Sequence, residues 1–159
     1  MQGVTFIAMK TDGTVQKRAL DLFGGIWILF IVTLLLSFAA TVIYMPESLT
    51  SPLVWASAAV VVVAWLLCRR FTAGGRMGLS FGMSSLIFAG LWGIVGATHF
   101  PNLVKATGEA ALNITMYNAS SGVKTLTVML GIALIGLPVV IIYTAFVYRV
   151  FRGKVMTSK

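Results

Sequence analysis

The sequence predicts an all-α membrane protein, a polytopic helix bundle with four transmembrane helices plus a helix remnant at the N-terminus. The first observation is composition: 58% of the 159 residues are hydrophobic, 10% are charged, and mean hydropathy is +0.97. Soluble domains are about 45–50% apolar and about 25% charged. The second is that four apolar runs approach or exceed the 20 or so residues that cross a roughly 30 Å hydrocarbon layer. We therefore expect a single membrane domain over residues 1–159.

The four expected spans cover residues 23–45, 52–70, 77–98 and 125–148. Met45-Pro46 closes the first span. Ser51-Pro52 starts the second, because proline at the first helical position loses no hydrogen bond. Pro138 lies near the middle of the fourth span, where its missing N–H frees the carbonyl of residue 134 and predicts a kink. Two connections are short, and the third, residues 99–124, is the only sizeable loop.

Residues 3–9 form an apolar stub that is too short to cross a membrane. Two interpretations stay open: the end of a transmembrane helix that begins outside this sequence, or an amphipathic N-terminus lying on the membrane surface. A signal peptide is not expected, because no basic segment precedes the stub and no small-residue cleavage site follows it.

The basic residues predict the orientation of the chain. Ten of the twelve fall on one side of a four-span topology, against Lys105 and Lys124 on the other. Because cytoplasmic loops are enriched in Lys and Arg, both termini and the loop 69–76 are expected in the cytoplasm. The net charge of +8 is thus spread over short juxtamembrane segments, which argues against nucleic-acid binding and leaves anionic lipid headgroups as a minor possibility.

The apolar runs inside these spans, residues 23–44, 53–68, 77–98 and 125–148, contain no Asp, Glu, Lys, Arg or His, and Arg69 and Arg70 lie at the interfacial end of the second span. Intramembrane charges mark ion paths and proton relays, so an autonomous pump, proton-coupled transporter or haem binder is disfavoured. Isolated candidates for chemistry are His99, Cys68, Glu47 and Glu109, and none has a partner nearby in the sequence. We expect no catalytic, cofactor-binding or metal-binding residue. The Asn-x-Ser/Thr triplets at Asn113 and Asn118 are interpreted as chance.

Small residues in the third span predict close helix contacts. Ser85, Ala89, Gly93 and Ala97 recur every four residues, and Gly78 and Gly82 form a Gly-x-x-x-Gly pair. Small residues at this spacing let helix backbones approach in lipid. Trp65 and Trp92 lie deeper in their spans and are expected to pack against neighbouring helices.

Four segments together resemble one known family: residues 2–13 (QGVTFIAMKTDG), Phe100-Pro101, residues 112–121 (LNITMYNASS) and residues 125–155. They are similar to the C-terminal half of subunit II of the cytochrome bd-type quinol oxidases. The match extends over essentially the whole chain, and residues 117–155 are its most specific part.

The resemblance implies a prokaryotic membrane complex that oxidises quinol and reduces O2 to water. It implies that haems b and d and the quinol site belong to partner subunit I, and that this chain is a haem-free structural part. Membrane lipids and quinone are further expected contacts. It also implies that the N-terminal half of subunit II is missing, through a fragment or a split subunit. The rival hypothesis from the residues is a small homo-oligomeric channel, holin or transporter.

Overall fold

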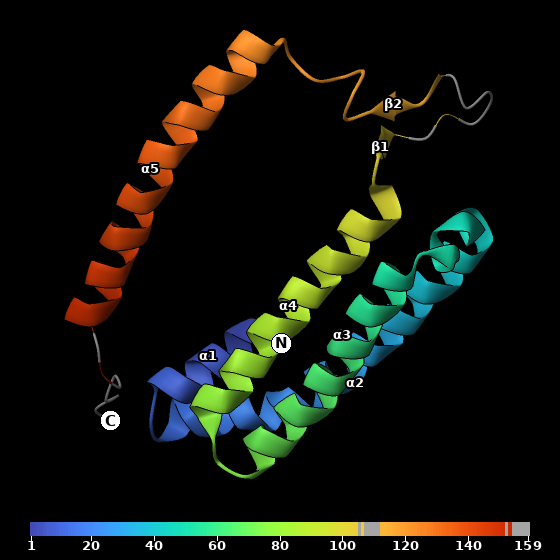
Figure 1. Cartoon of the computed structure of the whole chain (residues 1–159). Coiled ribbons are helices and arrows are strands. Elements are labelled where there is room, and N and C mark those ends of the chain that lie inside the picture. The colour runs from blue at the N-terminus through green and yellow to red at the C-terminus, as the bar shows by residue number, and fades with distance from the viewer. Residues whose placement is uncertain (105, 107–111, 152, 154–159) are drawn as a thin grey trace. The chain divides into compact units, whose positions relative to one another are not determined.

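A computed structural model describes residues 1–104, 106, 112–151 and 153. They form two compact units, Met1–Phe100 and Pro101–Gly153. The first contains α1 (Gln2–Lys10), α2 (Thr14–Tyr44), a 3-10 turn η1 (Pro46–Thr50), α3 (Pro52–Ala73) and α4 (Met77–His99) (Figure 1). The second contains strands β1 (Asn102–Val104) and β2 (Ile114–Thr115) and helix α5 (Val123–Val150). The predicted all-α class is confirmed.

Four of the helices are long and apolar enough to cross a membrane: α2, α3, α4 and α5, with 31, 22, 23 and 28 residues. Each contains one predicted apolar run. Helix α2 begins nine residues before its expected span, because Lys17, Arg18 and Asp21 end the apolar run without ending the helix. Ala19, in this extension, and Phe23, one turn later at the start of the expected span, are both buried. Packing inside the unit therefore stabilises a helical turn that hydropathy alone excludes from the span.

Two glycines with positive φ make the tight turns of the first unit. Gly13, with φ of 74°, joins α1 to α2, and Gly75, with φ of 70°, joins α3 to α4. The Gly75 N–H bonds to the Thr72 carbonyl and the Arg76 N–H to the Phe71 carbonyl. This is the Schellman pattern, which uses a left-handed residue to satisfy the last carbonyls of a helix. Both turns lie at the same end of the unit (Figure 1).

The core of the first unit is small and lies among α2, α3 and α4. Its buried members are Phe23, Val61, Ala64, Cys68 and Ile87. Helices α3 and α4 run antiparallel and side by side (Figure 1), and α1 packs against α2 and α4.

The second unit has a different character. Its two short strands pair antiparallel, with Asn102 opposite Thr115. Helix α5 continues through Pro138, and none of its 28 residues is buried. The predicted kink at Pro138 stays a prediction.

Candidate functional site

The N-terminal helix is attached to α4 by hydroxyl and amide groups. The Thr5 and Ser84 hydroxyl oxygens are 3.0 Å apart, and both residues are buried. Gln2 Nε2 donates to Ser85 Oγ at 3.2 Å. Phe6 packs on Phe81, with ring centroids 5.5 Å apart. In lipid, where apolar surface gives no association energy between helices, such hydrogen bonds are a main source of helix pairing.

A second group of polar side chains joins α3 to α4 near their shared turn. Ser80 is its centre: its hydroxyl lies 2.6 Å from Thr72 Oγ1 and 3.4 Å from Cys68 Sγ. Cys68 and Ser80 are almost completely buried. This three-residue group, Cys68, Thr72 and Ser80, is called the α3–α4 polar cluster below. Its groups satisfy one another, so it suits packing better than chemistry.

Glycine lets α3 and α4 approach each other closely at a point farther from their shared turn. A Cβ atom added to Gly90 would lie 2.7 Å from Val61 Cγ2 and 3.4 Å from the Ser57 carbonyl oxygen. One added to Gly93 would lie 2.7 Å from Ser57 Oγ. The predicted small-residue contact is therefore real at Gly93. Gly78 and Gly82 have nothing within 4 Å of such a Cβ in the described structure, and the sequence did not single out Gly90.

Two tryptophans join α2 to α3. The Trp27 and Trp65 rings stack at 3.8 Å with an interplanar angle of 9°. Each indole N–H donates to the other residue's backbone carbonyl, at 3.1 and 3.2 Å. The Arg69 guanidinium lies over the Trp27 ring, 4.5 Å from its centroid. The predicted packing of Trp65 is confirmed, whereas Trp92 is 64% exposed in this chain.

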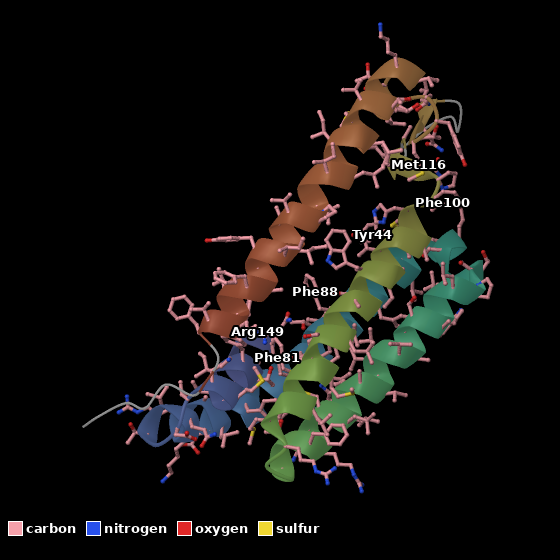
Figure 2. The ribbon with its side chains drawn as sticks, turned by 60° about the vertical axis from the view of Figure 1, so that its left-hand side comes forward. Tyr44, Phe81, Phe88, Phe100, Met116 and Arg149 are labelled. Atoms are coloured by element: carbon pink, nitrogen blue, oxygen red, sulfur yellow. The ribbon has the colours of Figure 1, made fainter. Side chains whose placement is uncertain are left out.

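A pocket of about 200 Å³ opens beside the N-terminal end of α1. Its lining is mostly apolar and comes from three helices and the first residue: Met1, Gln2, Phe30, Ser84, Ile87, Phe88 and Leu91. Figure 2 shows Phe81 and Phe88 on α4, seven residues and thus two turns apart. The pocket offers one amide and one hydroxyl but no acid, base or nucleophile pair, so it can hold an apolar group without acting on it.

The isolated candidates for chemistry are dispersed. Cys68 is buried in the polar cluster. His99 is exposed at the end of α4, with Nδ1 2.9 Å from the Val95 carbonyl oxygen. Glu47 lies in η1, and Glu109 lies outside the described residues. Within the described part of the chain, no three His, Cys, Asp or Glu residues are close enough to hold a metal ion.

The pocket beside α1 does not fit a haem held by either isolated candidate ligand, because neither His99 nor Cys68 lines it. A haem iron needs an axial ligand facing a cavity that admits the macrocycle.

Asparagine side chains hydrogen-bond to the backbone of the described residues around β2. Asn113 Oδ1 accepts a hydrogen bond from the Ala106 N–H at 2.9 Å. Asn118 Oδ1 accepts from the Thr115 N–H at 2.7 Å, and Asn118 Nδ2 donates to the Asn113 carbonyl. Both asparagines of the Asn-x-Ser/Thr triplets thus shape the local backbone, which gives them a structural role that the sequence did not reveal.

Comparison with known proteins decides the family. The family described as Cytochrome bd terminal oxidase subunit II matches residues 1–151. The chain belongs to this family. This match confirms the resemblance that the sequence indicated. Four helices of the chain are apolar and long enough to cross a membrane, so this member of the cytochrome bd subunit II family is a multi-pass membrane protein.

Three curated relatives show how much of the subunit is covered. Cytochrome bd ubiquinol oxidase subunit 2 of Bacillus subtilis is 32% identical over 96% of this chain and 46% of its own length. Cytochrome bd-I ubiquinol oxidase subunit 2 of Escherichia coli is 30% identical over 66% of this chain and 28% of its own. The Probable cytochrome oxidase subunit 2 of Haemophilus influenzae is 29% identical over 65% and 27%. The chain therefore spans half or less of the length of these relatives.

Proposed function

We propose that this chain is a haem-free structural and assembly part of a cytochrome bd-type terminal oxidase in a prokaryotic cell membrane. The complete complex would oxidise quinol and reduce O2 to water in the aerobic respiratory chain. Haems b and d would be bound by partner subunit I, which supplies the redox chemistry. The role of this chain would be to cover and stabilise that partner.

The observation that carries the proposal is the match of the family Cytochrome bd terminal oxidase subunit II to residues 1–151. Helix α5 agrees with a place in a larger helix assembly, because it finds no cover inside its own unit, where none of its 28 residues is buried. A helix that is hydrophobic all round is covered by lipid or by other helices.

We further propose that the other half of subunit II takes part in this cover. The Bacillus relative has about twice the length matched here, so its remaining half corresponds to no residue of this chain. Helix α2, whose most apolar window has no buried residue, would face that half or subunit I. Lipid and quinone would fill the surface that remains.

The proposed orientation places both termini in the cytoplasm. It rests on the ten basic residues on one side of the topology against two on the other. Reporter fusions after residue 50 and after Arg149 test it: a periplasm-active reporter should work only at the first position.

Co-purification tests the oxidase assignment. A C-terminal affinity tag should recover a haem-containing partner with b- and d-type absorbance from membranes. A colourless, self-associated preparation would contradict the proposal. Ion flux through the purified chain alone in liposomes would instead support the homo-oligomeric channel.

A further inference from the structure

One end of the first unit is strongly basic. It carries the residues near the α1–α2 and α3–α4 turns, which lie together (Figure 1). Six are basic and two are acidic, Asp12 and Asp21, giving 6 − 2 = +4. The basic residues are Lys10, Lys17, Arg18, Arg69, Arg70 and Arg76. This basic end terminates three apolar helices, so it lies at a membrane surface whichever way the chain faces.

Arg69 differs from the other basic residues because its head group is held in place. Its guanidinium lies 4.5 Å from the centroid of Trp27. Trp27 is itself fixed by stacking on Trp65 and by the two reciprocal indole hydrogen bonds. Arg69 follows Trp65 by four residues, so both stand on the same face of α3. A preorganised guanidinium loses less conformational entropy on binding than a free one.

We call the position of the Arg69 guanidinium on the Trp27–Trp65 pair the Arg69 seat. The apolar surface around it favours a lipid as the ligand. Leu66, three residues before Arg69 and on the same face of α3, is 52% exposed. Ile28, next to Trp27, is 54% exposed. A ligand at Arg69 would thus meet charge at one end and apolar surface at the other, which matches a phosphate headgroup above an acyl chain.

We propose that Arg69, seated on the Trp27–Trp65 pair at the basic end, binds the phosphate of an anionic phospholipid. The ring contact uses the charge of the guanidinium and leaves its N–H donors for a phosphate, which the planar fork can bind in bidentate fashion. The flanking basic residues add long-range attraction to an anionic membrane surface. This proposal does not depend on the oxidase assignment.

Native mass spectrometry of the full-length chain, released from phosphatidylcholine micelles with added phosphatidylglycerol, tests the seat. Arg69→Gln should weaken phosphatidylglycerol binding about ten-fold, because it removes the charge-assisted hydrogen bonds that the guanidinium would make directly to the phosphate. The matched control is Arg70→Gln, which removes the same charge from the next residue but not from the tryptophan ring. It should weaken binding less than two-fold. Unchanged thermal unfolding midpoints establish that both variants are folded.

Three results would overturn the inference. Equal losses in Arg69→Gln and Arg70→Gln would show a diffuse charge effect without a seat. Unchanged binding in Arg69→Gln would remove the residue from the site. Displacement of phosphatidylglycerol by equimolar glycerophosphoglycerol, its soluble headgroup, would show a site for soluble phosphates instead of a lipid. A Trp27→Phe variant adds a graded check, with an expected loss of two- to three-fold because phenylalanine binds cations less well.

Discussion

Helices α3 and α4 of the first unit and helix α5 of the second are all long enough to cross a membrane, yet they differ in what they bury inside their own units. Helices α3 and α4 each bury four residues, whereas α5 buries none. Their most apolar windows have mean hydropathies of 1.9 and 1.6, against 2.5 for α5. The less apolar helices are therefore the ones that bury residues inside their own unit. Glycine and hydroxyl groups, which lower hydropathy, make the contacts between α3 and α4.

The largest expected effect comes from filling the gap at Gly90. Gly90→Ala places a Cβ atom 2.7 Å from Val61 Cγ2 and should force α3 and α4 apart. Overpacking of this kind costs about 1–3 kcal/mol. The measurement is the free energy of unfolding of the purified chain in mixed micelles titrated with a denaturing detergent.

Gly82→Ala is the matched control on the same helix. Nothing lies within 4 Å of a Cβ atom at this position in the described structure, so stability should stay level or rise by up to about 1 kcal/mol as a helix glycine is removed. If Gly82→Ala proved as damaging as Gly90→Ala, the close α3–α4 approach would not be the cause.

A smaller effect is expected from the α3–α4 polar cluster. Ser80→Ala removes the hydroxyl that lies 2.6 Å from Thr72 Oγ1, and should lower the free energy of unfolding by about 0.6–1.7 kcal/mol. Thr41→Ala serves as the comparison, because the Thr41 hydroxyl makes a solvent-exposed hydrogen bond to the Ser37 carbonyl of its own helix. Its change should stay within about 0.5 kcal/mol. Equal changes in the two variants would show that the cluster adds no more to the free energy of unfolding than a hydroxyl that bonds within its own helix.

The smallest effect on the isolated chain is expected at Pro138. Pro138→Ala should change the unfolding free energy of the first unit by less than about 0.5 kcal/mol, because Pro138 belongs to the second unit and lies on a helix that buries no residue there. If a kink at Pro138 fits a groove on a partner, the same variant should lower recovery of the tagged complex while membrane insertion is unchanged. Full recovery of the complex would remove Pro138 from the contact.

The long apolar segments could be predicted from the sequence because the membrane fixes their length and composition. Helix α2 shows the limit of that reasoning. Lys17, Arg18 and Asp21 are incompatible with the hydrocarbon layer but not with a helix, so its true start at Thr14 depends on packing. Hydropathy locates the part of a helix in lipid and leaves its aqueous extension undefined.

The contact residues were harder to predict, because spacing defines a face without saying which face is used. The four-residue stripe correctly included Gly93, but the close approach is completed by Gly90, three residues earlier. The Gly-x-x-x-Gly pair at Gly78 and Gly82 faces no neighbour in the described chain. The sequence held one indication of the Trp27–Trp65 contact. Each tryptophan lies within about three helical turns of a pair of basic residues, which places both near the same surface of the membrane.

The attachment of α1 to α4 also has a consequence for synthesis of the chain. Thr5 and its partner Ser84 are separated by 79 positions in the sequence. At roughly 5–20 residues per second, the ribosome makes Ser84 about 4–16 s after Thr5. During that interval α1 can pair with α2, whose Gln16 side chain donates to the Ala8 carbonyl, but not with α4. A factor that holds newly made membrane helices would shield the α4-facing side of α1 until Ser84 is made.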